Sequence, residues 1–295
     1  MRKNLKQAVY TNHTSQAIGL DIAIALANFI TGKDNLHYGL WDDLEVNLGN
    51  LGAAQEAYTK KLLSYLPQKK SLNILDIGGG GGETAKLLLN LGHKVTVIVP
   101  SPILAERSKK NTKGCANIKL CTFEDYNSQN NETFDVCLFS ESFQYIPLKK
   151  GLSKASKLLK KNGRILIADC FRSNIKKRIN HRPPGGGHYL EEMFNEININ
   201  NLEIVKKEEI TKSVSPSIDL EQKFYKTIGT IITRITESYS IKHPFMFKMM
   251  RRAYKLFLNR KKRKDLHTRL FENSRNSEIF EYYNHYMIFL LKQNF

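Results

Sequence analysis

The chain has 295 residues, of which 41% are hydrophobic and 25% charged, which is the composition of a folded protein with a sizeable core. The length allows one large α/β domain or two smaller ones. Lysine and arginine (46) exceed aspartate and glutamate (28), and the net charge of +18 favours anionic partners such as nucleic acid, lipid headgroups or an acidic metabolite. The apolar runs are about five residues long, whereas a membrane-spanning helix needs roughly 20, so we do not expect an integral membrane protein.

The beginning of the chain has some features of an exported protein. Arg2, Lys3 and Lys6 precede an apolar stretch at residues 17–30. Asp21 interrupts that stretch, and the stretch begins too far from the first residue for a usual signal peptide. We therefore expect a cytoplasmic protein. The four cysteines show no CxxC spacing, and we expect them to be buried, reduced thiols.

Helical periodicity predicts helices at residues 16–29 and 53–66, with an aromatic segment at residues 37–41 between them. From residue 72 onward, strands and helices alternate. The predicted strands are residues 72–77, 94–99, 118–123, 134–140 and 164–170, and the predicted helices are residues 83–91, 102–111 and 149–159. Short apolar strands separated by ten-residue helices predict a mostly parallel sheet that is covered by helices on both faces.

The alternation ends near residue 170. A helix is predicted at residues 188–198, a strand at 202–211 and a final strand at 286–291, after a long basic helical stretch. We therefore predict one doubly wound α/β domain with additions. Its parts are an N-terminal helical arm or lid (residues 1–70), the core (71–212), a basic helical cap insertion (213–277) and the last strand of the core (278–295).

The stretch from Leu75 to Gly82 is the most informative motif of the chain. It reads Leu-Asp-Ile followed by five glycines, between a predicted strand and a predicted helix. Glycines at such a turn allow positive φ angles and the close approach of a ligand. A dinucleotide-binding turn has the spacing GxGxxG and a pyrophosphate at the start of the helix, where Glu83 would repel it. The motif therefore favours a different ligand, and a flexible turn without a ligand is the alternative.

The pattern resembles the first motif of the class I S-adenosylmethionine-dependent methyltransferases, an acid followed by alternate glycines. Asp76, Gly78, Gly80 and Gly82 match it, and the resemblance is best over residues 72–211. It implies a Rossmann-like fold with a mostly parallel sheet of seven strands. It also implies S-adenosyl-L-methionine as the cofactor and S-adenosyl-L-homocysteine as its product, and no metal is expected.

The resemblance further implies which residues contact the cofactor. The methionine moiety is expected against the glycine turn, and the adenine is expected beside Phe123 and Glu124 at the end of the third strand. For Glu124, an ordinary role as a solvated loop acid is the alternative. Tyr38 and Ser140 are also expected to contact the cofactor.

One position departs from the family pattern. The second strand normally ends in an acid that binds both ribose hydroxyls, and the matching residue here is Val99. Ser101 offers one hydroxyl contact, which is weaker than a bidentate carboxylate. This departure bears on cofactor affinity and not on the fold.

The fourth strand runs into Ser-Glu-Ser-Phe-Gln-Tyr-Ile-Pro at residues 140–147. Ligands of open α/β sheets bind at the carboxyl ends of the strands, so these side chains are expected to face the transferable methyl group. Glu141 is predicted to accept a proton, orient the acceptor or stabilise a cation. Tyr145, Gln144 and His37 are predicted to orient the acceptor, although a hydrogen-bonded structural role is the alternative for His37.

The same segment bears on the class of acceptor. Members of the family that methylate DNA and RNA bases carry Asp/Asn-Pro-Pro-aromatic at this place, and this chain does not. The Ser-Glu-Ser form is similar to the branch that methylates sterols, tocopherols and related molecules. The aromatic segment and the insertion before the last strand are similar to that branch as well. The resemblance thus implies a small or lipid-like acceptor and leaves N-, O-, C- and S-methylation open.

Residues 244–264 contain nine lysine and arginine residues and no acid. At helical spacing, apolar residues from Met246 to Phe257 share one face, and four basic residues share the opposite face. Three interpretations are open: a cap helix whose apolar face covers the active site, a peripheral contact with an anionic membrane at its inner surface, or binding of nucleic acid. No RNA-binding module accompanies the charge, so nucleic acid is not expected.

The sequence therefore predicts a cytoplasmic S-adenosylmethionine-dependent methyltransferase that acts on a small or lipid-like molecule by in-line displacement. One alternative is an RNA methyltransferase, which the charge favours and the fourth-strand motif opposes. The other is a non-catalytic binding module, which Val99 suggests.

Overall fold

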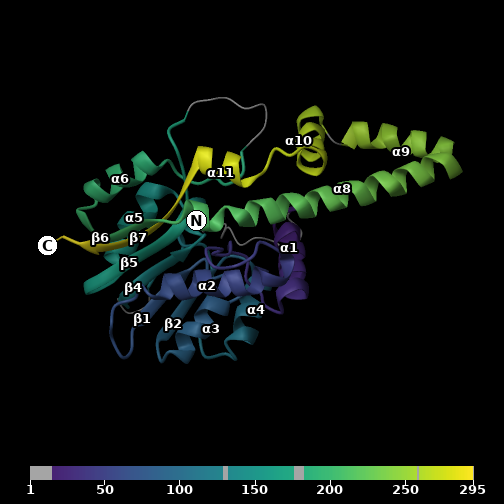
Figure 1. The fold of residues 1–295 in the computed structure, drawn as a ribbon. Helices are drawn as coiled ribbons and strands as arrows, with labels where there is room; N and C mark the ends of the chain where they lie inside the picture. The colour runs from purple at the N-terminus through teal and green to yellow at the C-terminus, as the bar shows by residue number, and fades with distance from the viewer. Residues whose placement is uncertain (1–14, 129–131, 176–182, 258, 295) are drawn as a thin grey trace, which may run out of the picture. The chain divides into compact units, whose positions relative to one another are not determined.

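The computed structural model describes residues 15–128, 132–175, 183–257 and 259–294 (Figure 1). The first 14 residues of the expected N-terminal arm thus lie outside the described residues. The chain divides into two compact units. Unit 1 comprises Met1–Asn174, Gly185–Val214 and Asn284–Phe295, and unit 2 comprises Ile175–Pro184 and Ser215–Tyr283.

Unit 1 is built on a seven-stranded sheet with the strand order β3-β2-β1-β4-β5-β7-β6. The strands are β1 (Asn73–Ile77), β2 (Lys94–Val99), β3 (Asn117–Leu120), β4 (Phe134–Ser140), β5 (Leu159–Arg172), β6 (Leu202–Glu209) and β7 (Asn284–Gln293). Strands β1 to β5 pair in parallel, and β7 runs antiparallel between β5 and β6. The strand order reverses between β1 and β4, which confirms the doubly wound, mostly parallel α/β fold.

Helices precede, connect and follow the strands of unit 1 (Figure 1). They are α1 (Ser15–Thr31), η1 (Leu48–Asn50), α2 (Leu51–Leu63), α3 (Glu83–Asn90), α4 (Pro102–Asn111), η3 (Phe143–Tyr145), α5 (Leu148–Lys157), α6 (Leu190–Ile199) and α7 (Thr211–Val214). Local sequence explains where α4 begins. The Ser101 side chain accepts a hydrogen bond from the N–H of Leu104, and Pro102 occupies the first turn, where its missing N–H costs nothing.

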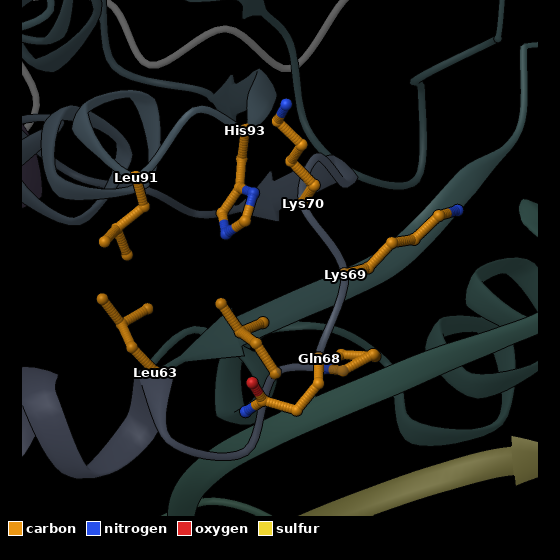
Figure 2. A pocket seen from close by; sticks show the side chains of 8 residues that line it. Leu63, Gln68, Lys69, Lys70, Leu91 and His93 are labelled. Atoms are coloured by element: carbon orange, nitrogen blue, oxygen red, sulfur yellow. The ribbon is translucent and has the colours of Figure 1, made fainter.

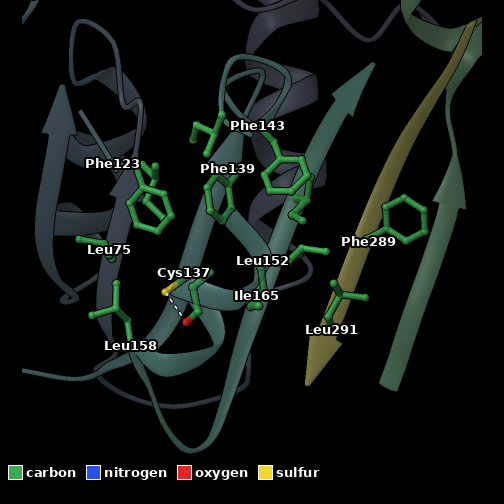
Figure 3. Packing of buried hydrophobic residues seen from close by; sticks show 14 of the residues in the cluster. Leu75, Phe123, Cys137, Phe139, Phe143, Leu152, Leu158, Ile165, Phe289 and Leu291 are labelled. Carbon is green, nitrogen blue, oxygen red and sulfur yellow. Dashed lines mark hydrogen bonds between the residues drawn. The ribbon is translucent and has the colours of Figure 1, made fainter. Parts of the chain in front are cut away.

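The main hydrophobic cluster holds the centre of the sheet in place (Figure 3). Within it, the Phe139 ring packs edge to face against Phe123 and Phe143, with centroid distances of 5.6 and 5.1 Å. Strand β4 is buried on both faces apart from Asp135 and Ser140, as expected for a parallel strand between two layers of helices. This packing fixes the carboxyl ends of β1 and β4, where the polar residues described below are found.

Unit 2 is helical, with α8 (Pro216–Lys242), α9 (Pro244–Phe257), α10 (Arg260–Phe271) and α11 (Ser277–Tyr283). Helix α8 contacts the other three helices. Its buried residues, among them Ile218 and Leu220, all lie in the part of the helix that ends at Gly229. Within the part of the chain that the structure describes, no helix is long and apolar enough to cross a membrane.

The predicted elements occur close to their expected bounds, with three differences. Strand β3 ends at Leu120 and not at residue 123, because Thr122 accepts a hydrogen bond from the N–H of Asp125 and starts a turn. Strand β5 begins earlier than expected, at Leu159. Residues 278–283, which were assigned to the last strand, are helical in α11, whose start is capped by the Asn276 side chain.

The cysteines and the basic insertion also differ in part from expectation. All four cysteines are free thiols, and Cys137 and Cys170 are buried, but Cys115 is exposed and Cys121 is half-buried. In the insertion, α9 buries none of its side chains, so the described residues of unit 2 leave the methionine-rich face uncovered.

Candidate active site

The turn between β1 and α3 is shaped by its glycines. Gly78, Gly80 and Gly82 have φ angles of +76°, +52° and +83°, which residues with a side chain rarely adopt. A Cβ atom on Gly78 would collide with the Cβ atom of Ser142. A Cβ atom on Gly80 would meet no atom within 4 Å, because Gly80 faces an open cavity.

This cavity has a volume of about 580 Å³, a size typical of small-molecule sites, and lies wholly in unit 1. Its walls come from α1, residues 34–37, the glycine turn and the carboxyl ends of β1, β2 and β4. The predicted site residues that line it are Asp76, Gly78, Gly80, Phe123, Glu124, Ser140, Glu141, Tyr145 and His37. The predicted site residues that do not line it are Tyr38, Gly82, Ser101 and Gln144.

Asp76 brings a buried carboxylate to the wall of the cavity beside the glycine turn. Its Oδ2 atom has no hydrogen-bond partner among the described residues. Burial raises the pKa of Asp76 to about 7. A buried carboxylate without a partner is costly, and a cationic ligand group would supply the missing interaction. This wall therefore fits a ligand that carries a positive charge next to the glycine turn.

Glu141 follows β4 with a φ angle of +53°, a strained conformation for a residue with a side chain. Its Oε1 atom accepts hydrogen bonds of 2.8 Å from the N–H of Tyr38 and from the hydroxyl of Tyr286. The Tyr58 hydroxyl lies 2.8 Å from that of Tyr286 and 3.2 Å from Oγ of Ser140. No described group donates to Oε2 of Glu141, so this atom is available to a ligand in the cavity.

Burial sets the protonation of this network. It raises the pKa of Glu141 to about 8, against the effect of the two hydrogen bonds, and the nearby Asp169 raises it further. Burial also raises the pKa of Asp169 to about 7, although backbone N–H groups stabilise its charge. For Tyr58 and Tyr286, burial raises the pKa well above the usual range, so both remain neutral. The Glu141 carboxyl can thus take up or release a proton near neutral pH.

The other residues expected to orient an acceptor differ in their surroundings. Tyr145 lines the cavity, whereas Gln144 donates its backbone N–H to Oδ2 of Asp169 at 2.9 Å. The two ring nitrogens of His37 lie 2.9 Å from the Tyr38 carbonyl and 3.2 Å from Oγ1 of Thr59. Burial lowers the pKa of His37 to about 4. These partners favour the structural interpretation of His37.

The end of β2 carries no carboxylate. Val99 and Pro100 line the cavity where the family pattern has the ribose-binding acid. Ser101 is buried, and its Oγ accepts the N–H of Leu104 at 3.4 Å. The Ser101 hydroxyl thus caps α4, and this end of the cavity is apolar.

Three residues of the site were not among the sequence candidates: Asp34, Tyr58 and Tyr286. Asp34 lines the cavity, and its carboxylate accepts hydrogen bonds from Arg107 at 3.1 Å and Asn111 at 3.0 Å. Tyr286 lies near the start of β7, opposite Cys170 of β5. An antiparallel last strand begins at the edge where the parallel strands end, and this rule would have pointed to Tyr286. No sequence signal distinguishes Tyr58 from the other apolar residues of α2.

A second cavity lies near the amino ends of β1 and β2 (Figure 2). The residues labelled around it are Leu63, Gln68, Lys69, Lys70, Leu91 and His93. No carboxylate lines it, and Lys69 forms a salt bridge with Asp135 at 2.8 Å. Because open α/β sheets bind ligands at the carboxyl ends of their strands, the first cavity is the candidate active site.

Comparison with known proteins finds a family match within unit 1. Residues 75–167, which run from β1 into β5, match the protein family described as "Methyltransferase domain". The uncharacterized methyltransferase YodH of Bacillus subtilis (strain 168) is 31% identical over 113 residues, which are 37% of this chain and 48% of that protein. The chain spans about half the length of the curated relatives it matches.

Two solved structures show the same fold over nearly the whole chain. The [4+2]-cyclase SpnF has a TM-score of 0.64 at 14% identity, covering 95% of this chain and 97% of its own. A geranyl diphosphate methyltransferase, solved with GPP and sinefungin, has a TM-score of 0.61 at 15% identity, covering 92% and 94%. At such identities the likeness establishes the fold alone, which is the Rossmann-like fold of methyltransferases.

Proposed function

We propose that the whole protein is an S-adenosyl-L-methionine-dependent methyltransferase that acts on a small or lipid-like acceptor, because residues 75–167 match the family described as "Methyltransferase domain". One observation carries the proposal. The unpartnered carboxylate of Asp76 lies buried beside a glycine turn that opens into a cavity of small-molecule size. This combination suits a cationic, amino-acid-like ligand better than a phosphate, because two negative groups would repel each other.

The residues around the cavity fit the proposed cofactor. Asp76 would bind the ammonium group of its methionine moiety, and Phe123 with Glu124 would flank its adenine. Val99 and Pro100 would meet the ribose with an apolar wall. When bound, the cofactor supplies a methyl group on a positively charged sulfur.

The position and the pKa of Glu141 support a role as general base for the acceptor. Its Oε1 atom accepts hydrogen bonds from Tyr38 and Tyr286, Oε2 has no described donor, and the residue lines the cavity. A pKa of about 8 lets this carboxyl accept a proton from the acceptor near neutral pH. Tyr58 keeps the Tyr286 hydroxyl directed at the carboxylate through their 2.8 Å contact.

The lining of the cavity supports the proposed acceptor class. It includes the apolar residues Leu20 and Ala23 of α1 and Leu36, Leu104 and Ile146. Such a wall suits a small or lipid-like acceptor, and the similar fold of a methyltransferase solved with GPP supports this class. Nucleic acid is not part of the proposal. A cytoplasmic location, with peripheral contact at the inner membrane surface, is proposed from unit 2.

A non-methylating role is the second candidate, and the apolar end of β2 is the observation that favours it. Without a carboxylate for the ribose, cofactor affinity is expected to be lower than in the family pattern. The fold allows other chemistry, since SpnF carries the same fold and is a cyclase. Measured affinity for the cofactor separates the two candidates.

Calorimetry of the full chain with S-adenosyl-L-homocysteine tests the proposal. Gly80→Val should weaken binding at least about 100-fold, because the new side chain would project into the cavity. Gly114→Val is the matched control. Gly114 also has a positive φ angle (+73°) and open space around its Cβ position, but it does not line the cavity.

The two variants carry similar backbone strain, about 1–2 kcal/mol. Any common effect on folding therefore appears in both, and only Gly80→Val should lose the ligand. Full affinity in Gly80→Val would place the ligand elsewhere. Failure of the wild-type chain to bind S-adenosyl-L-homocysteine would reject the proposed function.

A further inference from the structure

Helix α9 of unit 2 has two faces of opposite character. At about 100° per residue, Lys248, Arg251, Arg252 and Lys255 fall within an arc of about 100°. All other residues of the helix are apolar or aromatic and fill the remaining surface. A helix with this division is typical of one that lies at a boundary between water and an apolar phase.

The apolar face of α9 is exposed, and none of the described residues of unit 2 covers it. Phe245, Leu256 and Phe257 are 75%, 84% and 87% exposed. The three methionines of the helix, Met246, Met249 and Met250, are each more than half exposed. Soluble proteins rarely leave so many large apolar side chains in water without an interaction partner.

The end of α8 also carries exposed apolar residues. Helix α9 packs beside α8 (Figure 1), and the Tyr239 hydroxyl donates to the sulfur of Met246 at 3.7 Å. Ile235 and Ile241 of α8 are 62% and 82% exposed. The exposed apolar residues thus belong to two helices that are in contact. The hydrogen bond between Tyr239 and Met246 joins these helices.

Positive charge borders the same surface. Helix α10 begins with five consecutive basic residues, Arg260 to Lys264. None of the nine basic residues between 244 and 264 forms a salt bridge with a described carboxylate. The nearby acids Glu237 and Glu272 pair with Arg234 and His267 instead. The cations are therefore available to anionic groups.

We propose that α9 docks on the surface of an anionic lipid bilayer and lies in its plane. The phenylalanines, methionines and leucine would enter the boundary between headgroups and acyl chains, while the basic face and the start of α10 would contact the headgroups. Nucleic acid fits the charge but leaves the apolar face in water. This proposal concerns unit 2 alone and does not depend on methyl transfer.

Sedimentation with lipid vesicles tests the charge requirement. The full chain should bind vesicles of phosphatidylcholine mixed with phosphatidylglycerol and should bind pure phosphatidylcholine at least tenfold more weakly. Binding should weaken strongly between about 0.1 M and 1 M salt, as the screening length falls from about 10 Å to about 3 Å. Vesicle binding that ignores both lipid charge and salt would contradict the proposal.

A matched pair of charge variants locates the contact. Changing residues 260–264 together to Gln should weaken binding at least about 100-fold, since each basic residue near an anionic surface contributes about fivefold. The control changes five exposed lysines of unit 1 to Gln, namely Lys109, Lys110, Lys113, Lys149 and Lys150. The control has the same net charge and should bind within about threefold of the wild type.

Tryptophan probes test whether the apolar face enters the lipid. Leu256→Trp should show a blue-shifted emission with anionic vesicles and be quenched by lipids brominated on the acyl chain. Lys255→Trp, on the basic face, should be quenched much less. The natural Trp41 is buried in unit 1 and provides the same background in both variants.

Three further outcomes would overturn the proposal. The first is wild-type protein that fails to sediment with anionic vesicles at low salt. The second is equal quenching at positions 255 and 256, which would mean adsorption by charge without insertion. Tight RNA binding that competes with the vesicles and needs residues 260–264, but leaves position 256 unaffected, would assign the surface to nucleic acid. Cofactor binding is measured separately, so none of these results bears on the proposed methyl transfer.

Discussion

At the scale of single residues, Glu141 combines the features that a reactive carboxyl needs. Its backbone is strained at a φ angle of +53°, one oxygen accepts hydrogen bonds from two donors, and the other has no described donor. Strained residues persist only where the surrounding structure holds them, and they are frequent at active sites. The four-residue network of Glu141, Tyr286, Tyr58 and Ser140 does this by linking β4, β7 and α2.

Replacing this carboxyl gives a kinetic prediction. Glu141→Gln should lower kcat by about 100-fold or more, because a positioned general base contributes about 10²–10⁴. The amide keeps an acceptor oxygen for Tyr38 and Tyr286, so affinity for S-adenosyl-L-homocysteine should stay within about threefold. Transfer of a radiolabelled methyl group to the acceptor, followed over pH, is the measurement.

In the wild type, turnover should rise as pH increases through about 8, where Glu141 loses its proton. This rising limb should be absent from the Gln variant. Equal turnover of the two proteins at all pH values would reduce Glu141 to a structural residue.

The same substitution predicts a change in stability. The folded protein raises the pKa of Glu141 from 4.5 to about 8, so its contribution to stability is fully present below pH 4.5 and is lost as pH rises through about 8. Glu141→Gln removes that loss. The variant should be more stable than the wild type by about 1–3 kcal/mol near pH 9 and similar near pH 5. Urea unfolding at the two pH values measures the difference, and a larger gain at the acid end would be inconsistent with a raised pKa.

At the scale of elements, a single side-chain hydroxyl stabilises the start of helix α4. Ser101 caps α4 through the N–H of Leu104, while Val99 and Pro100 form the wall of the cavity. The sequence suggested a ribose contact for Ser101 because it follows the strand that ends in an acid in the family. The N-cap role of Ser101 accounts for a serine at this position without any contact to a ligand.

Ser101→Ala separates the two roles. Loss of an N-cap should lower the free energy of unfolding by about 1 kcal/mol and leave affinity for S-adenosyl-L-homocysteine within about twofold. Urea unfolding and calorimetry on the same preparation give both values. A loss of affinity above tenfold with little change in stability would return Ser101 to the ribose site.

At the scale of the whole molecule, the two units differ in how they hold together. Unit 1 has an extensive core around its sheet, whereas the described residues of α8 beyond Gly229 and of α9 are not buried. The cavity is lined by unit 1 alone, and the exposed amphipathic helix belongs to unit 2 alone. Ligand binding and surface docking are therefore separable properties.

Hydrogen exchange followed by mass spectrometry tests this separation. S-Adenosyl-L-homocysteine should slow exchange in the turn around Gly80 and in the segment around Glu141, because a bound ligand suppresses local opening. Exchange in residues 244–257 should remain unchanged. Anionic vesicles should give the reverse pattern. Protection of both regions by either agent alone would show that the units are coupled.

The sequence by itself determined the fold and the glycine turn beside the cavity. Alternating apolar strands and amphipathic helices require a covered parallel sheet, because the buried strands have no polar face to expose to water. The glycine turn after Asp76 also follows from local rules, since positive φ angles and close packing exclude a side chain whatever the rest of the chain does.

Only the tertiary structure decided the partners of the reactive groups. The network around Glu141 joins Tyr38, Tyr58 and Tyr286, which are up to 145 positions away in sequence, and no local pattern encodes such contacts. The tertiary structure also decided which of these carboxyl groups are buried. The carboxyls of Asp76 and Glu141 acquire their raised pKa values from the side chains packed around them. For α9, the sequence periodicity predicted an apolar face and a basic face. Only the structure showed that the described helices of unit 2 leave the apolar face exposed.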